Sequence, residues 1–96
     1  MGYNSGMRKS REELKEMYNR LKDKVVVGGF YAHFKSHDEK TYQVVGIGLM
    51  EDTWQPLVMY EHVASGVRTV RTLENFLEKI EIDGAKTFRF VFLGNE

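Results

Sequence analysis

The sequence predicts a mainly β (α+β) domain: a small SH3-like curved antiparallel sheet or barrel of about five strands. An N-terminal amphipathic helix and one short helix before the last strand complete the prediction. One segment near the N-terminus repeats its apolar residues with the helical period, whereas most of the remaining chain alternates with the period of two that strands show. Turns that contain glycine or aspartate separate the alternating segments. The short length of the predicted strands favours a strongly bent sheet.

Size and composition fit one small domain. The 96 residues are 42% hydrophobic, so we expect a flexible tail at residues 1–9 and a single domain at 10–96 with a modest core. A chain this small is marginally stable alone, so a homo-oligomer is one expectation. The absence of cysteine excludes disulfides and thiolate chemistry.

Charge and hydropathy narrow the class of partner. Fourteen basic residues balance fourteen acidic ones, so bulk charge does not drive the protein onto nucleic acid or membrane. No apolar run approaches the roughly 20 residues that span a bilayer, and Met1–Lys9 lacks the apolar stretch of a signal peptide. We therefore expect a cytoplasmic protein with no membrane partner.

The helix is predicted over residues 11–23. Ser10 and Glu13 form the S-x-x-E capping box that begins a helix. One apolar stripe follows at helical spacing and consists of Leu14, Met17, Tyr18 and Leu21. Such a stripe usually packs on the domain's own core, and a partner surface is the alternative.

The sheet is predicted over residues 25–93. Val25 to Gly29 lead into an opening strand at 30–35, and a polar turn at 36–40 follows. Further strands are expected at 41–50, 57–63, 67–71 and 87–93. Thr72 is a suitable N-cap for a helix over 73–80, and Asp83-Gly84 marks a turn.

The opening strand has two different faces, because side chains alternate across a strand. Phe30, Ala32 and Phe34 point one way and are typical of a core, which they are expected to share with the last strand's Phe88, Phe90 and Phe92. The other face carries Tyr31, His33 and Lys35. A ring, an imidazole and an ammonium side by side are not required by core packing, so this face is the first candidate for a site.

Two glycines interrupt the second strand. Gly46 and Gly48 are expected to share a face with Tyr42 and Val44, by simple alternation. The gap that they leave admits a backbone, a large side chain or a ligand. Strong curvature of a small barrel explains them equally well.

An ordered set of residues runs through these strands. It consists of an aromatic-x-His-aromatic-Lys strand, a Tyr-x-Val strand, an acidic-Thr turn, a Leu-Val-x-Tyr strand, a Val-Arg pair, a helical Phe and an Arg-Phe pair. The residues are Tyr31, His33, Phe34, Lys35, Tyr42, Val44, Asp52, Thr53, Leu57, Val58, Tyr60, Val70, Arg71, Phe76, Arg89 and Phe90. This set, over about residues 29–91, resembles DUF1653, a family of small bacterial and phage domains of unknown function. The chain departs from the pattern at Thr72, where the family has Pro.

Convergence of the polar strand faces predicts a ligand-binding site. Its candidate residues are Tyr31, His33, Lys35, Tyr60, His62 and Arg71. Arginine binds phosphate or carboxylate bidentately, lysine adds a point charge and tyrosine stacks, so the set suits a phosphate- or nucleobase-bearing ligand. The alternative is that Tyr60 is core, Lys35 is solvated and Arg71 pairs with Glu61 or Glu51.

Metal and catalytic interpretations are weaker. His33 and His37 have the spacing of ligands on a helix, but on a strand they lie roughly 13 Å apart, so no metal or other cofactor is expected. The sequence has no G-x-S-x-G motif and no Walker loop.

We therefore expect a non-catalytic binding module with a Tyr/His/Lys/Arg pocket for a small anionic ligand. A nucleotide is one form of that ligand, and sequestering a signalling nucleotide is one role such a pocket would serve. The alternative is a protein- or single-stranded nucleic-acid-interaction module. A small enzyme that uses His33 comes third.

Overall fold

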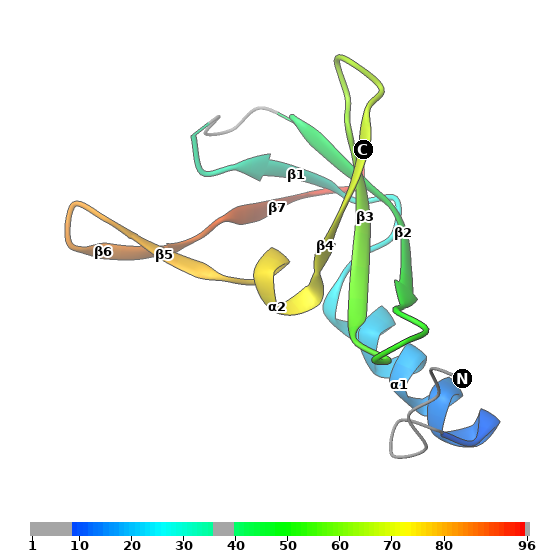
Figure 1. The fold of residues 1–96 in the computed structure, drawn as a ribbon. Coiled ribbons are helices and arrows are strands. Elements are labelled where there is room, and N and C mark those ends of the chain that lie inside the picture. The colour runs from blue at the N-terminus through cyan, green and yellow to red at the C-terminus, as the bar shows by residue number, and fades with distance from the viewer. Residues whose placement is uncertain (1–8, 36–39, 96) are drawn as a thin grey trace.

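The main element of the computed structural model is an open antiparallel sheet of five strands (Figure 1). The structure describes residues 9–35 and 40–95. The sheet has the order β4-β3-β2-β1-β7, with β1 (Phe30–His33), β2 (Tyr42–Leu49), β3 (Pro56–His62), β4 (Arg68–Thr72) and β7 (Phe90–Gly94). The predicted mainly β fold with a curved antiparallel sheet is confirmed. The sheet does not close into a barrel, because β4 and β7 are its two edges.

The N-terminal helix α1 (Arg11–Lys24) begins at the predicted capping box. The Glu13 amide donates to Ser10 Oγ at 3.1 Å, and the Ser10 amide donates to Glu13 Oε1 at 2.9 Å. Of the apolar stripe, Leu21 is buried and Tyr18 is exposed. Residues 1–8 of the expected tail lie outside the described residues. Neither described helix is long and apolar enough to cross a membrane.

The second helix is shorter than predicted. α2 covers Leu73–Phe76 and is capped by Thr72, whose Oγ1 accepts from the Asn75 amide at 3.1 Å. The segment expected to continue this helix instead forms β5 (Lys79–Ile82), which pairs with β6 (Ala85–Phe88). Asp83 and Gly84 join these two strands with φ of +51° and +82°, the left-handed conformations of a tight hairpin turn. We call this pair of strands the arm, and Figure 1 shows it extending away from the sheet.

The predicted last strand is divided at Arg89 into β6 and β7. The Arg89 amide donates to the Glu78 carbonyl at 2.9 Å, and its carbonyl accepts from the Phe34 amide at 2.9 Å. The amide of this residue therefore bonds to the residue before β5, and its carbonyl bonds to the residue after β1. The break explains why Phe88 and Phe90 differ, since Phe88 is exposed on the arm and Phe90 is buried.

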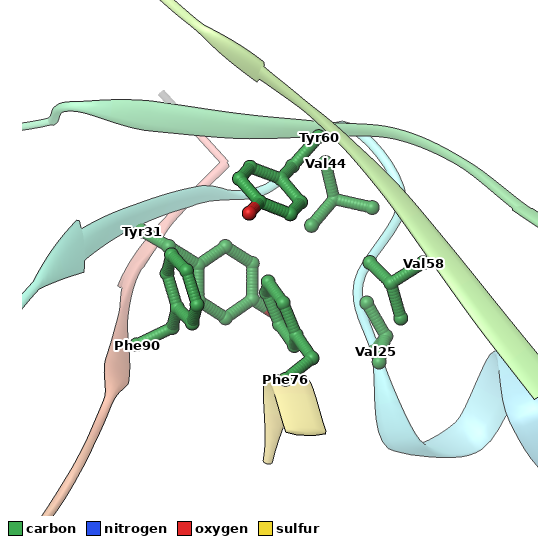
Figure 2. Packing of buried hydrophobic residues seen from close by; sticks show 7 residues of the cluster. All are labelled: Val25, Tyr31, Val44, Val58, Tyr60, Phe76 and Phe90. Atoms are coloured by element: carbon green, nitrogen blue, oxygen red, sulfur yellow. The ribbon is translucent and has the colours of Figure 1, made fainter. Parts of the chain in front are cut away.

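The core lies on one face of the sheet, which we call the inner face. Its buried residues come from four strands, from α2 and from the end of α1 (Figure 2). They are Val25, Tyr31, Val44, Val58, Tyr60, Phe76 and Phe90. The rings of Phe76 and Phe90 stack with centroids 4.6 Å apart and an interplanar angle of 11°. Tyr31 meets Phe76 edge to face at 5.2 Å.

The predicted assignment of faces on β1 is therefore wrong for its aromatic residues, although Ala32 is buried as predicted. Tyr31, expected at a site, is 6% exposed in the core, whereas Phe30 and Phe34 are only half-buried. The reason is that Phe76 and Val25 cover the inner face, to which Tyr31 and His33 point. Of the expected partners, only Phe90 belongs to the core cluster, and Phe88 and Phe92 are exposed.

The two glycines of β2 lie on the opposite face from the one predicted. The pairing of β2 with β3 shifts between Val44 and Gly46, so that Val44 is opposite Tyr60 and Gly46 is opposite Met59. A β-bulge of this kind adds one residue and reverses the alternation beyond it. Gly46 and Gly48 therefore belong to the outer face of the sheet, away from the core.

Replacing Phe76 by alanine is expected to lower the free energy of unfolding by about 3–5 kcal/mol. Phe76 is 1% exposed and contacts the rings of Phe90, Tyr31 and Tyr60, so its loss leaves a cavity. Urea unfolding followed by circular dichroism measures the change. The matched control is Phe88→Ala on the arm, where the ring is 45% exposed. An equal loss in the two variants would contradict a core centred on α2.

Candidate functional site

Basic and aromatic side chains gather around Phe90 at one end of the inner face. Three of the predicted site residues surround its ring: His33 at 5.4 Å and Tyr60 at 5.2 Å between ring centroids, and the Arg71 guanidinium carbon at 5.6 Å. We call the group the basic aromatic cluster, and it consists of His33, Tyr42, Tyr60, Arg71, Arg89 and Phe90. Figure 2 shows the buried side of this group, where Tyr60 and Phe90 face Phe76.

Arg71 is fixed by two uncharged acceptors. It lies on β4 opposite Val58, so its side chain points to the inner face. Its Nε donates to the Tyr60 hydroxyl at 2.8 Å, and its Nη1 donates to Asn75 Oδ1. These bonds hold the guanidinium over the Phe90 ring without neutralising its charge. The predicted alternative of a pair with Glu61 is wrong, because the Glu61 carboxylate binds Arg68 at 2.9 Å.

Arg89 enters the cluster from the break between β6 and β7. Its Nη2 donates to Glu78 Oε2 at 2.9 Å, so one carboxylate balances this guanidinium. Its Nε is buried and has no hydrogen-bond acceptor among the residues that the structure describes. A buried donor left unsatisfied costs about 1–3 kcal/mol, and more when it is charged.

His33 lies among these cations at the end of β1. Its Nδ1 accepts from the Lys35 amide at 3.3 Å, which fits a neutral ring with its proton on Nε2. Burial is the main cause that lowers the pKa of His33 below its ordinary value, and the positive charges of Arg89, Lys35 and Arg71 lower it further. The local field is therefore positive.

Tyr42 is the ring that connects the cluster. It begins β2 and lies opposite His62 on β3. Its ring centroid is 5.3 Å from that of Tyr60, 5.6 Å from that of Phe90 and 6.4 Å from that of His33. The ring is only half-buried, so part of it is accessible beside the cations.

The remaining predicted residues lie at the margins. Tyr31 belongs to the core, where its hydroxyl accepts from the Val26 amide at 3.3 Å and burial raises its pKa. Lys35 is exposed, with Nζ 5.6 Å from the Phe34 ring. His62 contacts Tyr42 at 5.4 Å between ring centroids, and its Nδ1 lies 2.8 Å from Ser65 Oγ. It lines a hollow of about 220 Å³ with Lys40, Thr41, Val63 and Ala64.

Sequence reasoning assigned Phe90 to the core alone and missed two further members of the cluster. Tyr42 and Arg89 both lie in the motif set that carries the family resemblance, but neither was assigned to the site. Alternation along β2 does not show which of its faces carries Tyr42 toward the cluster. The pairing of β2 with β3 shows that Tyr42 is on the inner face. Arg89 required the break in the last strand to be known.

The described residues contain no group of three or more His, Asp or Glu side chains placed to hold a metal ion. His37, the second histidine of the metal spacing considered above, lies outside the described residues, as do Asp38 and Glu39.

The fold and the cluster define a small mainly β domain with a positively charged, aromatic inner face. A family model described as a protein of unknown function, DUF1653, matches residues 29–92, two thirds of the chain. The chain belongs to the DUF1653 family. Comparisons with curated proteins and with solved structures found no significant match.

The pKa of His33 makes stability depend on pH. Because the folded state holds this pKa below the ordinary 6.5, the unfolded chain binds more protons in the window just below 6.5. The free energy of unfolding is therefore not reduced by protonation of His33 above pH 6.5. It decreases as the pH falls through 6.5 toward the lowered pKa of the folded state. We expect the His33 ring signals to titrate below 6.5 by NMR, with assignment from His33→Gln. In that variant, the fall in the urea midpoint over this window becomes smaller.

Arg89→Gln should raise the pKa of His33 toward its ordinary value, because it removes the largest charge contribution. The matched control is Arg20→Gln on α1, where the arginine is paired with Glu16 and exposed. A His33 midpoint at or above 6.5 in the parent protein, or equal effects of the two variants, would contradict the electrostatic interpretation.

Proposed function

We propose that this protein is a non-catalytic binding module that binds a small anion through Arg71 and Arg89, with a nucleotide as the favoured form of ligand. The observation that supports this most directly is the pair of guanidinium groups in one cluster, only one of which has a carboxylate partner among the residues that the structure describes. The positive charges of both arginines act on His33, and a bound anion offsets this positive field.

Arg71 supports anion binding because it is positioned but not neutralised. The Nε N–H donates to the Tyr60 hydroxyl, and one Nη1 N–H donates to Asn75 Oδ1. These two bonds fix the plane of the guanidinium. An arginine has five N–H donors in a rigid fork. The remaining donors suit the two oxygens of a phosphate or carboxylate.

Arg89 supports anion binding because its donor capacity is unmet. The Nε proton has no acceptor among the described residues while the side chain is partly exposed, with 24% of its surface accessible. An anion that draws this guanidinium outward supplies the missing acceptor and removes the cost of the buried donor. Binding would then involve a small movement of the side chain.

The half-buried ring of Tyr42 supports a ligand with a planar group. Stacking of a base on an aromatic ring is worth about 1–3 kcal/mol. The overall charge of the chain is zero, which disfavours general attraction to polyanions. A discrete anion with a flat substituent uses both features of the cluster, and a nucleotide has both.

Loss of Arg71 should weaken binding by one to two orders of magnitude, since a charge-assisted hydrogen bond contributes about 1.5–3 kcal/mol. The probes are inorganic phosphate, pyrophosphate and a panel of ribonucleotides, measured by thermal shift and then by calorimetry on the parent and on Arg71→Gln. A ligand at 100 times its Kd should stabilise the parent by about 2.7 kcal/mol. The matched control is Arg68→Gln, because Arg68 lies on the outer face.

If no probe shifts the melting temperature, or if Arg71→Gln and Arg68→Gln bind equally well, the proposed site is wrong. Binding of single-stranded RNA or DNA with a steep salt dependence, and no binding of mononucleotides, would instead favour the nucleic-acid-interaction module.

Tyr42→Leu distinguishes the contribution of the ligand's planar group to affinity from that of its anionic group. We expect nucleotide affinity to fall about 5- to 150-fold, the equivalent of about 1–3 kcal/mol of stacking, while affinity for pyrophosphate changes little. Isothermal calorimetry on the two ligands measures the difference. Equal losses for both would show that Tyr42 supports the fold of the cluster and does not stack on the ligand.

A further inference from the structure

We propose that the outer face of the sheet is the interface of a weak homodimer. The core is on the inner face, where α2 and the end of α1 contribute Phe76 and Val25. On the outer face, Met59, Val70 and Val91 remain 39%, 49% and 39% exposed. Sheets with one face in the core usually carry polar residues on the other, so apolar residues here require a different explanation.

The outer face is also hollowed. A cavity of about 180 Å³ is lined by Gly46, Ile47, Gly48, Leu57, Met59 and Val70, and none of these side chains is polar. A Cβ added at Gly46 or Gly48 would meet nothing within 4 Å. The hollow therefore exists because these two positions lack side chains. Glycine inside a strand weakens the sheet and often marks a close approach of another chain.

Projecting and recessed groups stand next to each other on this face. Met59 lies directly opposite Gly46 on one side and Val70 on the other. A second copy related by a two-fold axis presents the same arrangement reversed, so that each Met59 can enter the hollow of its partner. Self-complementarity of this kind is what a two-fold interface requires.

The charges on this face also favour a second copy over a charged partner. Glu61 and Arg68 lie at one end of the face and bind each other at 2.9 Å. Lys40 adds a positive charge at the same end, where its Nζ lies 5.3 Å from the ring of Phe30. The residues that line the hollow are uncharged, so the hollow gives no attraction to an acidic or basic partner.

The size of the face sets the strength of the dimer. Five strands at about 4.8 Å spacing and about 3.3 Å per residue give a surface about 24 Å wide and about 20 Å long. Each copy contributes about 500 Å², near the low end for specific interfaces. We therefore expect reversible association that depends on concentration.

Sedimentation equilibrium over a wide range of protein concentration tests the dimer. The parent should rise from monomer mass toward dimer mass, and Met59→Glu should shift this rise to at least tenfold higher concentration. Gly46→Val should also weaken association, because the valine fills the hollow. Its melting temperature should be unchanged or higher, since the added side chain meets open space and glycine disfavours a strand.

The matched control is Ile82→Glu on the arm, another exposed apolar residue, which should leave association unchanged. If Met59→Glu unfolds, Gly46→Val still decides the question. A monomer at every concentration overturns the proposal. A dimer that survives both outer-face variants, or that Ile82→Glu abolishes, places the interface elsewhere and also overturns it.

Discussion

The stacking of Phe76 on Phe90 is the contact on which the rest of the structure depends. It brings the single turn of α2 onto the inner face of the sheet and closes the core over Tyr31 and Tyr60. The other surroundings of Phe90 are His33, Tyr42 and the Arg71 guanidinium. One ring therefore belongs both to the core and to the basic aromatic cluster, so the geometry of the cluster is set by core packing.

The segment around α2 also holds the two arginines. Asn75 accepts from Arg71, and Glu78 accepts from Arg89 through its carboxylate and from the Arg89 amide through its carbonyl. A residue of β4 and the residue at the break between β6 and β7 are thereby fixed by one short stretch of chain. Arg71 and Arg89, which are far apart in the sequence, are therefore both held by side chains of this one segment.

Local signals in the sequence were sufficient for most of the elements, but not for the arm or for the faces of the strands. The capping box at Ser10, the N-cap at Thr72 and the alternation of the strands all predicted structure correctly. The bulge after Val44 reversed the face of Gly46 and Gly48, and period-two reasoning cannot detect an inserted residue. Asp83-Gly84 predicts a turn, and the same dipeptide between two strands is also a strong hairpin signal. The turn alone does not predict the arm, because the segment before it has the apolar spacing of a helix.

The candidate site was predicted in part, for a related reason. His33, Tyr60 and Arg71 do meet around Phe90, and the family motif had linked them. Tyr31 shares their face but lies where α2 covers it, and coverage by a distant element leaves no local trace in the sequence. The position of Arg89 could not be predicted, because the sequence around it predicts a continuous strand and the structure divides that strand at this residue.

The division of the last strand at Arg89 has a mechanical consequence. A two-stranded ribbon buries little surface, so such a unit opens more readily than the sheet that carries it. The arm is joined to the sheet through the Arg89 backbone, whose amide and carbonyl bond in opposite directions. We expect a displacement of the arm to move the Arg89 backbone, and with it a cationic side chain of the cluster.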